Sequence, residues 1–190
     1  SKARQAQSRV KALEKLERIA PAHVASPFDF HFDTPDNLPN PLLRLDAANV
    51  GYGATTILHR LALSVEAGSR IGLLGVNGAG KSTLVKLLAG ELPPQSGELI
   101  CAQTLKIGYF AQHQLDTLRP EESPLRHMQR LAPEVREQEL RTFLGGFNFR
   151  GDMVSDPVGP MSGGEKSRLA LAMIVWQKPN LLLLDEPTNH

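Results

Sequence analysis

The sequence predicts an α/β fold in which a mixed sheet is accompanied by a smaller helical subdomain. Three segments support this expectation: an apolar run at 71–74 that leads through glycines into a helical pattern, a second helical pattern at 162–176, and four leucines at 181–184. Strands that alternate with helical patterns in this way are typical of α/β proteins. With 190 residues, the chain is long enough for one main domain and an appendage.

The first 41 residues are expected to lie outside that domain. Residues 2–20 place apolar side chains at steps of three and four, which predicts an amphipathic or coiled-coil-like linker helix that ends at Pro21. Five prolines within 21–41 predict an extended connector. Residues 1–20 hold six basic and two acidic side chains, a charge of +4, which leaves −3 for the rest of a chain whose total is +1. This asymmetry suits either an acidic partner such as nucleic acid or a solvated helix face.

The compact domain is expected to span residues 42–190 and to begin with strands. The expected strands of its first half are 42–50, 57–65, 70–74, 98–101 and 105–110. Gly51, Tyr52 and Gly53 fall in the connection between the first two. A helix is expected at 80–89, where Gly90 ends it, and a turn at 92–97 follows.

The second half is expected to be mainly helical. Residues 124–144 show a helical pattern that Pro133 interrupts and that glycines 145 and 146 end. A helix is expected at 162–176, capped at its start by Ser162 or by the glycines after it. The leucines at 181–184 predict a parallel strand buried on both faces. The helical subdomain would therefore cover about 112–176.

A phosphate-binding loop is the strongest chemical signal in the chain. Its pattern G-x-x-x-x-G-K-[ST] is matched by Gly75, Val76, Asn77, Gly78, Ala79, Gly80, Lys81, Ser82 and Thr83. Glycines let the backbone turn tightly and aim its N–H groups at phosphates, and the following helix start favours negative charge. Lys81 would reach the outer phosphates and Ser82 would hold Mg²⁺. The alternative is a glycine turn before an ordinary helix, which the complete pattern and its position between strand and helix disfavour.

Two carboxylates follow the leucine run at its expected carboxyl end, where α/β sheets bind their ligands. Asp185 would hold the Mg²⁺ that Ser82 also contacts, and Glu186 would polarise a water for in-line attack on a γ-phosphate. Taken alone, this segment would indicate only a buried strand that ends in a solvated acidic turn. Its combination with the phosphate loop makes a nucleotide site the better interpretation.

A third anion-binding signal is the turn formed by Ser162, Gly163, Gly164 and Glu165 at a helix start. Backbone N–H groups, a hydroxyl and the helix dipole coincide there. The alternative is a plain helix cap, and this motif alone would not exclude it. Only 81 positions separate Ser162 from Lys81, so both motifs fit into one domain.

Together these motifs resemble those of the ATP-binding cassette (ABC) family over residues 42–190, and so imply a P-loop NTPase of the ABC type. Residues 75–83 resemble its Walker A loop, 162–165 its signature motif and 181–186 its Walker B strand. The resemblance implies that Tyr52 stacks on adenine and that Gln112 is the Q-loop residue that senses Mg²⁺ and the γ-phosphate. It also implies ATP sandwiched between the Walker A loop of one cassette and the signature of a facing cassette.

Residues 185–190 and Glu165, which replaces the commoner glutamine of the signature, resemble the ABC-F branch. Members of that branch carry two cassettes in one chain and act on the ribosome rather than on a membrane channel. The resemblance implies that this is the second cassette and that the basic helix approaches ribosomal RNA or tRNA through phosphate contacts. Three alternatives stay open: the ATP-binding subunit of a transporter, a chromosome-maintenance or repair ATPase, and a non-catalytic ATP-binding scaffold. ATPases of the second kind usually carry a long insertion between the phosphate loop and the signature, for which 81 residues leave no room. Glu186 disfavours the scaffold.

Two further expectations concern the setting of the chain. The single Cys101 and the absence of a long apolar run predict a cytoplasmic protein without a membrane partner. The family's switch histidine would lie beyond His190, so the sequence is expected to be a fragment that binds nucleotide but hydrolyses it poorly.

Overall fold

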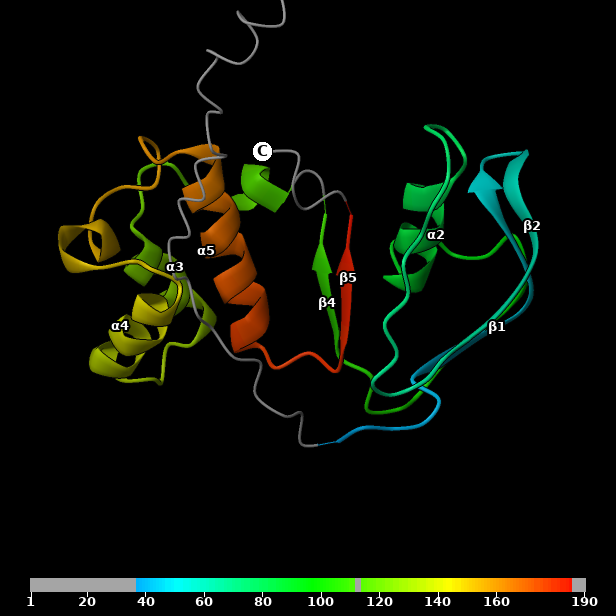
Figure 1. Ribbon diagram of the computed structural model, residues 1–190, viewed down its shortest axis with the longest axis horizontal. Helices are drawn as coiled ribbons and strands as arrows, with labels where there is room; N and C mark the ends of the chain where they lie inside the picture. The colour runs from blue at the N-terminus through cyan, green and yellow to red at the C-terminus, as the bar shows by residue number, and fades with distance from the viewer. Residues whose placement is uncertain (1–36, 112–113, 186–190) are drawn as a thin grey trace, which may run out of the picture.

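The computed structural model describes residues 37–111 and 114–185. The predicted helix at 1–20 and most of the predicted connector lie outside these residues. Figure 1 shows the described chain as two lobes, with β1, β2 and α2 on one side, the helices α3, α4 and α5 on the other, and β4 and β5 between them.

One lobe is built on a three-stranded antiparallel sheet in the order β2-β1-β3. Its strands are β1 (Leu43–Tyr52), β2 (Thr55–Val65) and β3 (Ser96–Cys101). Alternation places the side chains of Leu43 and Leu45 inside. They pack in one core cluster with Leu87 and Leu88 of α2 (Lys81–Leu88). The helix that follows the glycine loop is therefore fixed on this sheet.

Two parallel strands form the second sheet, β4 (Ile107–Phe110) and β5 (Leu181–Leu184), with Ile107 opposite Leu181 and Phe110 opposite Leu184. The predicted α/β class is confirmed, and the strand predicted at 181–184 is present and parallel. Its predicted burial on both faces is wrong, because β5 is only half-buried and Leu184 is 47% exposed.

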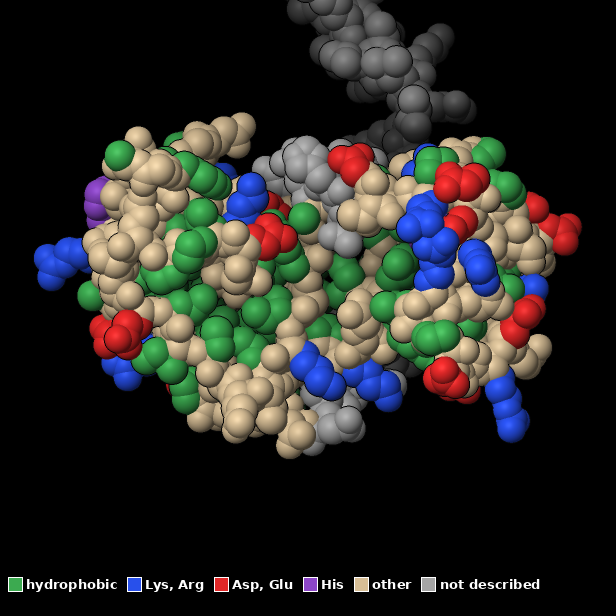
Figure 2. Space-filling view, turned by 180° about the vertical axis from the view of Figure 1, so that it is seen from behind, with side chains coloured by type: hydrophobic (Ala, Val, Ile, Leu, Met, Phe, Trp, Pro, Cys, Tyr) green, Lys and Arg blue, Asp and Glu red, His purple; other side chains and the backbone are tan. Residues whose placement is uncertain are grey.

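The predicted strand at 70–74 is also absent, because this segment has no regular structure. Ile71 and Leu73 face β5 across an apolar cavity of about 320 Å³, which α2 also lines. A strand exists only where its N–H and C=O groups pair with a neighbour, and an open cavity separates this segment from β5. Hydrophobic side chains gather across the middle of the face that Figure 2 shows.

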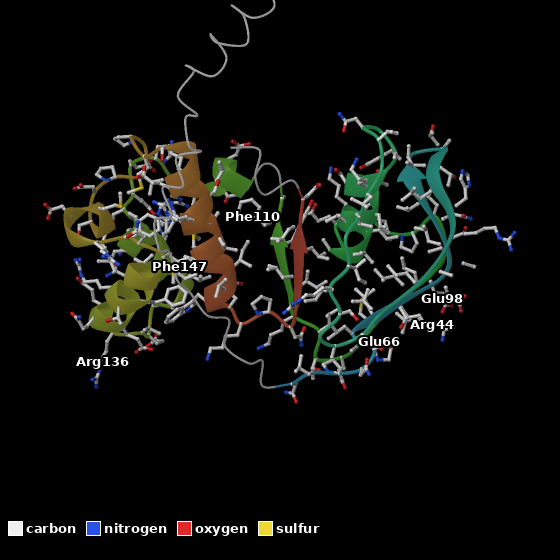
Figure 3. The ribbon with its side chains drawn as sticks, viewed as in Figure 1. Arg44, Glu66, Glu98, Phe110, Arg136 and Phe147 are labelled. Atoms are coloured by element: carbon white, nitrogen blue, oxygen red, sulfur yellow. The ribbon has the colours of Figure 1, made fainter. Side chains whose placement is uncertain are left out.

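The other lobe is the predicted helical subdomain. Its helices are α3 (Pro124–Leu131), α4 (Glu137–Gly146) and α5 (Gly163–Trp176), with short 3₁₀ helices at Gln114–Thr117 and Gly151–Val154. As predicted, the helical region is interrupted around Pro133. Fully buried Met128, Leu144 and Phe147 belong to its core, and Figure 3 shows Phe147 inside this lobe while Arg136 points away from it.

Packing of α5 against β4 connects the helical lobe to the parallel sheet. Phe110 of β4 is buried with Ala170 and Ile174 of α5 in a small core cluster of their own, and Figure 3 places Phe110 on the side of β4 that faces α5. The start of α5 and the carboxyl ends of β4 and β5 consequently lie at the same edge of the molecule (Figure 1).

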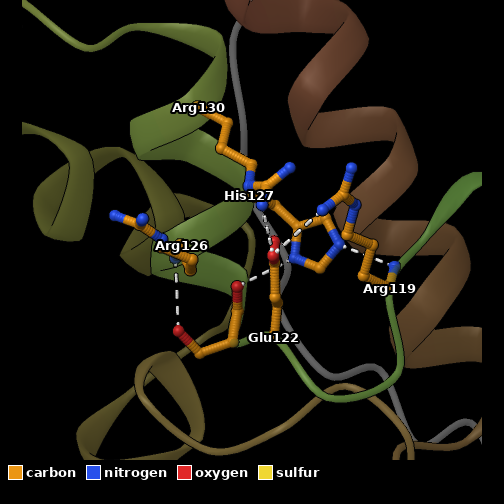
Figure 4. Close-up of polar contacts among 6 residues, drawn as sticks. Arg119, Glu122, Arg126, His127 and Arg130 are labelled. Atoms are coloured by element: carbon orange, nitrogen blue, oxygen red, sulfur yellow. Dashed lines mark hydrogen bonds and ion pairs between the residues drawn. The ribbon is translucent and has the colours of Figure 1, made fainter.

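A buried histidine fixes the start of α3 (Figure 4). His127 is 5% exposed, and its Nε2 accepts a hydrogen bond from the backbone N–H of Arg119 at 3.0 Å. The ring proton is therefore on Nδ1, which donates to the carbonyl of Ser123 at 2.9 Å. Beside it, Glu122 forms an ion pair with Arg130 at 2.7 Å. These contacts tie the segment before α3 to the helix.

Within the described residues, no helix is both long enough and apolar enough to cross a membrane.

Candidate nucleotide site

The glycine loop forms a cradle that its own lysine now fills. Lys81 Nζ donates hydrogen bonds to the carbonyls of Gly75 at 2.9 Å and Val76 at 3.0 Å. Asn77 and Gly78 form a turn at the tip of this loop, and the Ala79 N–H donates to the Val76 carbonyl at 3.2 Å. The lysine ammonium thus lies within the loop, where phosphate oxygens could replace the two carbonyls as its partners.

Gly80 lets the loop enter α2 close to the antiparallel sheet. Its φ of 89° is a left-handed conformation that side chains rarely adopt. A Cβ built on it would also lie 2.9 Å from Leu58 Cδ2 and 3.0 Å from Ile57 Cγ2. Glycine at this position therefore satisfies both the turn and the close contact with β2.

The predicted metal-binding pair is brought together across 103 positions of sequence. Ser82, in the first turn of α2, donates a hydrogen bond through its Oγ to Asp185 Oδ1 at 3.3 Å. Thr83, the next residue, is buried toward the core. A hydroxyl and a carboxylate are the hard oxygen ligands that Mg²⁺ accepts when phosphates and waters complete its shell. These residues fit that metal.

Asp185 is placed for this role by the parallel sheet. It follows β5 directly, its N–H donates to the Phe110 carbonyl at 3.0 Å, and the residue is only 8% exposed. The pKa of Tyr109 is raised to about 12, first by the partial burial of its hydroxyl and then by the negative charge of Asp185. Tyr109 keeps its proton at neutral pH. Sequence reasoning did not single out Tyr109, because only the pairing of β4 with β5 brings it near the acid.

Tyr52 ends β1 and is 49% exposed. It opens the turn to β2, the strand whose Ile57 and Leu58 lie against Gly80. A ring at the tip of this hairpin is therefore joined to the phosphate loop through one short segment of β2. This position is compatible with the predicted contact to a base.

The Ser162 turn forms the predicted cap of α5, as a full capping box. Ser162 Oγ accepts from the Glu165 N–H at 3.3 Å, and Glu165 Oε2 accepts from the N–H and the hydroxyl of Ser162, both at 2.8 Å. The backbone bond, then the hydroxyl bond, lower the pKa of Glu165, with a smaller contribution from Arg168. Gly163 and Gly164 form the first turn of the helix.

The Ser162 turn does not cover the phosphate loop of its own chain. Figure 1 shows β4 and β5 between α5 and α2, so the signature-like turn and Lys81 lie on opposite sides of the parallel sheet. Two further predicted residues, Gln112 and Glu186, lie outside the described residues. The structure thus brings Ser82 and Asp185 together, with Lys81 one residue before Ser82, and leaves Ser162–Glu165 apart from them.

The serine of the phosphate loop contacts the carboxylate that follows a parallel strand. In the adjacent helical lobe, the longest helix begins with Ser-Gly-Gly. Together these features define a nucleotide-binding domain of the ABC class. The family model described as ABC transporter matches residues 58–189. The chain belongs to the ABC family.

Within that family, the chain is similar to proteins of the F branch. It is 62% identical over 190 residues to the "Probable ATP-binding protein YheS" of Escherichia coli K12, covering all of this chain and 30% of that protein. It is 40% identical over 186 residues to "ABC transporter F family member 3" of Arabidopsis thaliana, covering 97% of this chain and 26% of that one. A solved bacterial Atm1-family ABC exporter with ATP bound matches with a TM-score of 0.65 and 26% identity, over 85% of this chain and 32% of the exporter. The chain thus spans about a third or less of each of these proteins.

Proposed function

We propose that this chain binds Mg²⁺-ATP at the phosphate loop and contributes one half of an ATP-hydrolysing site. The contact between Ser82 and Asp185 carries this proposal, because it brings together, at the start of α2 and the end of β5, the two oxygen donors that would hold Mg²⁺. The similarity to a solved exporter that has ATP bound adds support.

Each residue of the candidate site would have a separate role in binding and hydrolysis. Lys81 would exchange its bonds to the loop carbonyls for bonds to the outer phosphates. Ser82 and Asp185 would hold the Mg²⁺, and Gln112 is the proposed sensor of the metal and the γ-phosphate. Bound Mg²⁺ would neutralise charge on the phosphates during transfer. Glu186 would accept a proton from the water that attacks the γ-phosphorus, as the bond to the ADP oxygen breaks.

We further propose that Ser162, Gly163 and Gly164 act on the ATP of a facing cassette. Since β4 and β5 separate this turn from Lys81 in the same chain (Figure 1), a second cassette is needed to place a signature over this phosphate loop. The relatives are long enough for another cassette, because the matched region is 30% of the protein from E. coli. The 190 residues alone should then bind ATP but hydrolyse it poorly.

For the whole protein we propose action on the ribosome, as the F-branch resemblance implies, with residues 1–20 near the phosphates of ribosomal RNA or tRNA. The net charge of +4 on this segment and the similarity to an F family member support the proposal.

Replacing Glu186 by Gln in the full-length protein, together with its counterpart in the other cassette, tests the proposal. Binding without turnover should trap the closed pair, so that the variant sediments with ribosomes only when ATP is present, and steady-state hydrolysis should be lost. Recovery of membrane proteins in place of ribosomes would favour the transporter alternative. Rapid hydrolysis by the 190-residue chain alone, abolished by Glu186→Gln, would contradict the need for a facing cassette.

A further inference from the structure

A single exposed side chain connects the start of β3 to the turn that follows Tyr52. Gln95 Nε2 donates to the Gly53 carbonyl at 2.9 Å and reaches the Thr55 carbonyl at 3.5 Å. Its Oε1 accepts from Thr56 Oγ1 at 2.8 Å. One amide therefore holds both sides of a hairpin turn that lies about 40 positions away in sequence.

This arrangement uses both functions of the amide at position 95. The two carbonyls accept from its N–H₂ group and the threonine hydroxyl donates to its oxygen, so one side chain supplies a donor and an acceptor together. Glutamate would keep the acceptor and set a carboxylate against the carbonyls, whereas methionine would keep the length and lose both functions. The network thus selects glutamine for its chemistry as well as its size.

The backbone beneath Gln95 is itself fixed at an irregular point of the sheet. The Gln95 N–H donates to the Asn49 carbonyl at 2.8 Å, and Asn49 Nδ2 donates to Ser96 Oγ at 2.7 Å. The Arg60 N–H donates to Asn49 Oδ1 at 2.7 Å. The register of β1 shifts on both sides of Val50. Side-chain hydrogen bonds here take the place of backbone hydrogen bonds between strands, which are disrupted where a bulge redirects a strand.

Close contact across the hairpin leaves little freedom at its base. A Cβ on Gly51 would clash with the Thr55 carbonyl oxygen, so the two strands lie in close contact at the residue before Tyr52. A few residues further along β2, Ile57 and Leu58 lie against Gly80. The hairpin is therefore held against the phosphate loop through Ile57 and Leu58 and by Gln95 at its turn, which begins directly after Tyr52.

We propose that Gln95 is a positioning residue for the base of the nucleotide. By fixing the turn at 53–56, Gln95 holds the exposed Tyr52 ring in the position where the ring stacks on adenine. The phosphates are bound by the loop independently of Gln95. This inference rests on the proposed function, in which Tyr52 stacks on the base. A glutamine that supported the fold of the whole site would affect a ligand with a base and a ligand without one to the same extent.

The test compares ATP with tripolyphosphate, which has the phosphates and no base. Both are titrated calorimetrically with Mg²⁺ into the full-length protein, with the phosphate-loop lysine of any other cassette replaced so that one site is measured. Gln95→Met should weaken ATP binding about 3- to 10-fold, the loss of one or two exposed hydrogen bonds, and leave tripolyphosphate unchanged. Gln95→Glu should behave similarly. Gln103→Ala, at an exposed glutamine of another loop, is the matched control and should change neither.

Tyr52→Ala separates the inference from the proposed function. If Tyr52→Ala leaves ATP affinity intact, the proposed base contact fails and the role of Gln95 fails with it. If Tyr52→Ala weakens ATP selectively but Gln95→Met does not, only the inference about Gln95 is overturned. Equal weakening of ATP and tripolyphosphate by Gln95→Met would also overturn it, because the residue would then support the whole fold of the site.

Discussion

Individual side chains in this chain are held by partners that a nucleotide would have to replace. Lys81 is bound to the carbonyls of its own loop, and Ser162 is bound to Glu165. Neither is free to meet a phosphate until these bonds exchange. The energy gained from a phosphate is therefore reduced by the bonds that are given up, which are themselves charge-assisted.

Glu165 should make stability depend on acid pH. Its pKa is lowered in the folded chain, so its contribution is complete above its ordinary value of 4.5 and is lost as the pH falls through the lowered value. Glu165→Gln keeps the acceptor of the capping box without the charge. The free energy of unfolding, measured in urea from about pH 6 to about pH 3, should fall less steeply in this variant than in the native chain.

Ser162→Ala is the companion variant, because it removes both hydrogen bonds that the Ser162 hydroxyl makes with Glu165. It should lower the free energy of unfolding by about 1 kcal/mol at neutral pH. Identical pH profiles for the native chain and Glu165→Gln would show that the carboxylate charge does not stabilise α5.

Helix boundaries could be predicted from the sequence where the signal was local. The breaks near Pro133, the Ser162 cap and the start of α2 after Gly80 depend on residues that are neighbours in sequence, and all are present. The strand predicted at 70–74 depends instead on a partner strand, and apolar composition does not reveal whether one is there. The same reason explains the half-exposed β5, whose pairing with β4 covers only one edge.

The residues of the candidate site also divide into those that a local sequence pattern predicts and those that depend on strand pairing. Phosphate-loop residues and Asp185 could be found from their pattern, since each motif is contiguous. Gln95 and Tyr109 could not, because their partners are brought to them by the pairing of β1 with β3 and of β4 with β5.

The start of α3 should depend on His127. Replacing it by Leu keeps the buried volume but leaves the Arg119 N–H and the Ser123 carbonyl without their ring partners. We expect a loss of about 1 to 3 kcal/mol in the free energy of unfolding, read from the fluorescence of Trp176, the single tryptophan, which packs edge-on against Phe143. His59→Leu, at an exposed position of β2, should change it little. Equal effects of the two substitutions would contradict this role.

Across the whole molecule, the buried side chains form separate clusters, one around α2 and the antiparallel sheet and another within the helical lobe. This division suggests that damage to one lobe spreads only weakly to the chemistry of the other. Leu87 and Leu144 provide a matched pair, since both are fully buried leucines, one in each cluster.

Leu144→Ala and Leu87→Ala should each cost about 2 to 5 kcal/mol of stability. Only Leu87→Ala should also weaken Mg²⁺-ATP binding, because α2 carries Lys81 and Ser82 at its start. Thermal unfolding and ATP titration of both variants, under conditions where each is folded, check this expectation. An equal loss of ATP affinity in Leu144→Ala would mean that the two lobes act as one unit.

We propose that Ser82 and Asp185 form a magnesium site for a nucleotide on the phosphate loop. Measuring ATP affinity with and without Mg²⁺, in the native protein and in Asp185→Asn, tests this site. The native protein should bind ATP more tightly when Mg²⁺ is present. Asp185→Asn should lose most of that gain while keeping the weaker metal-free binding, because Lys81 and the loop are untouched. An undiminished response to Mg²⁺ in Asp185→Asn would show that Asp185 does not hold the metal.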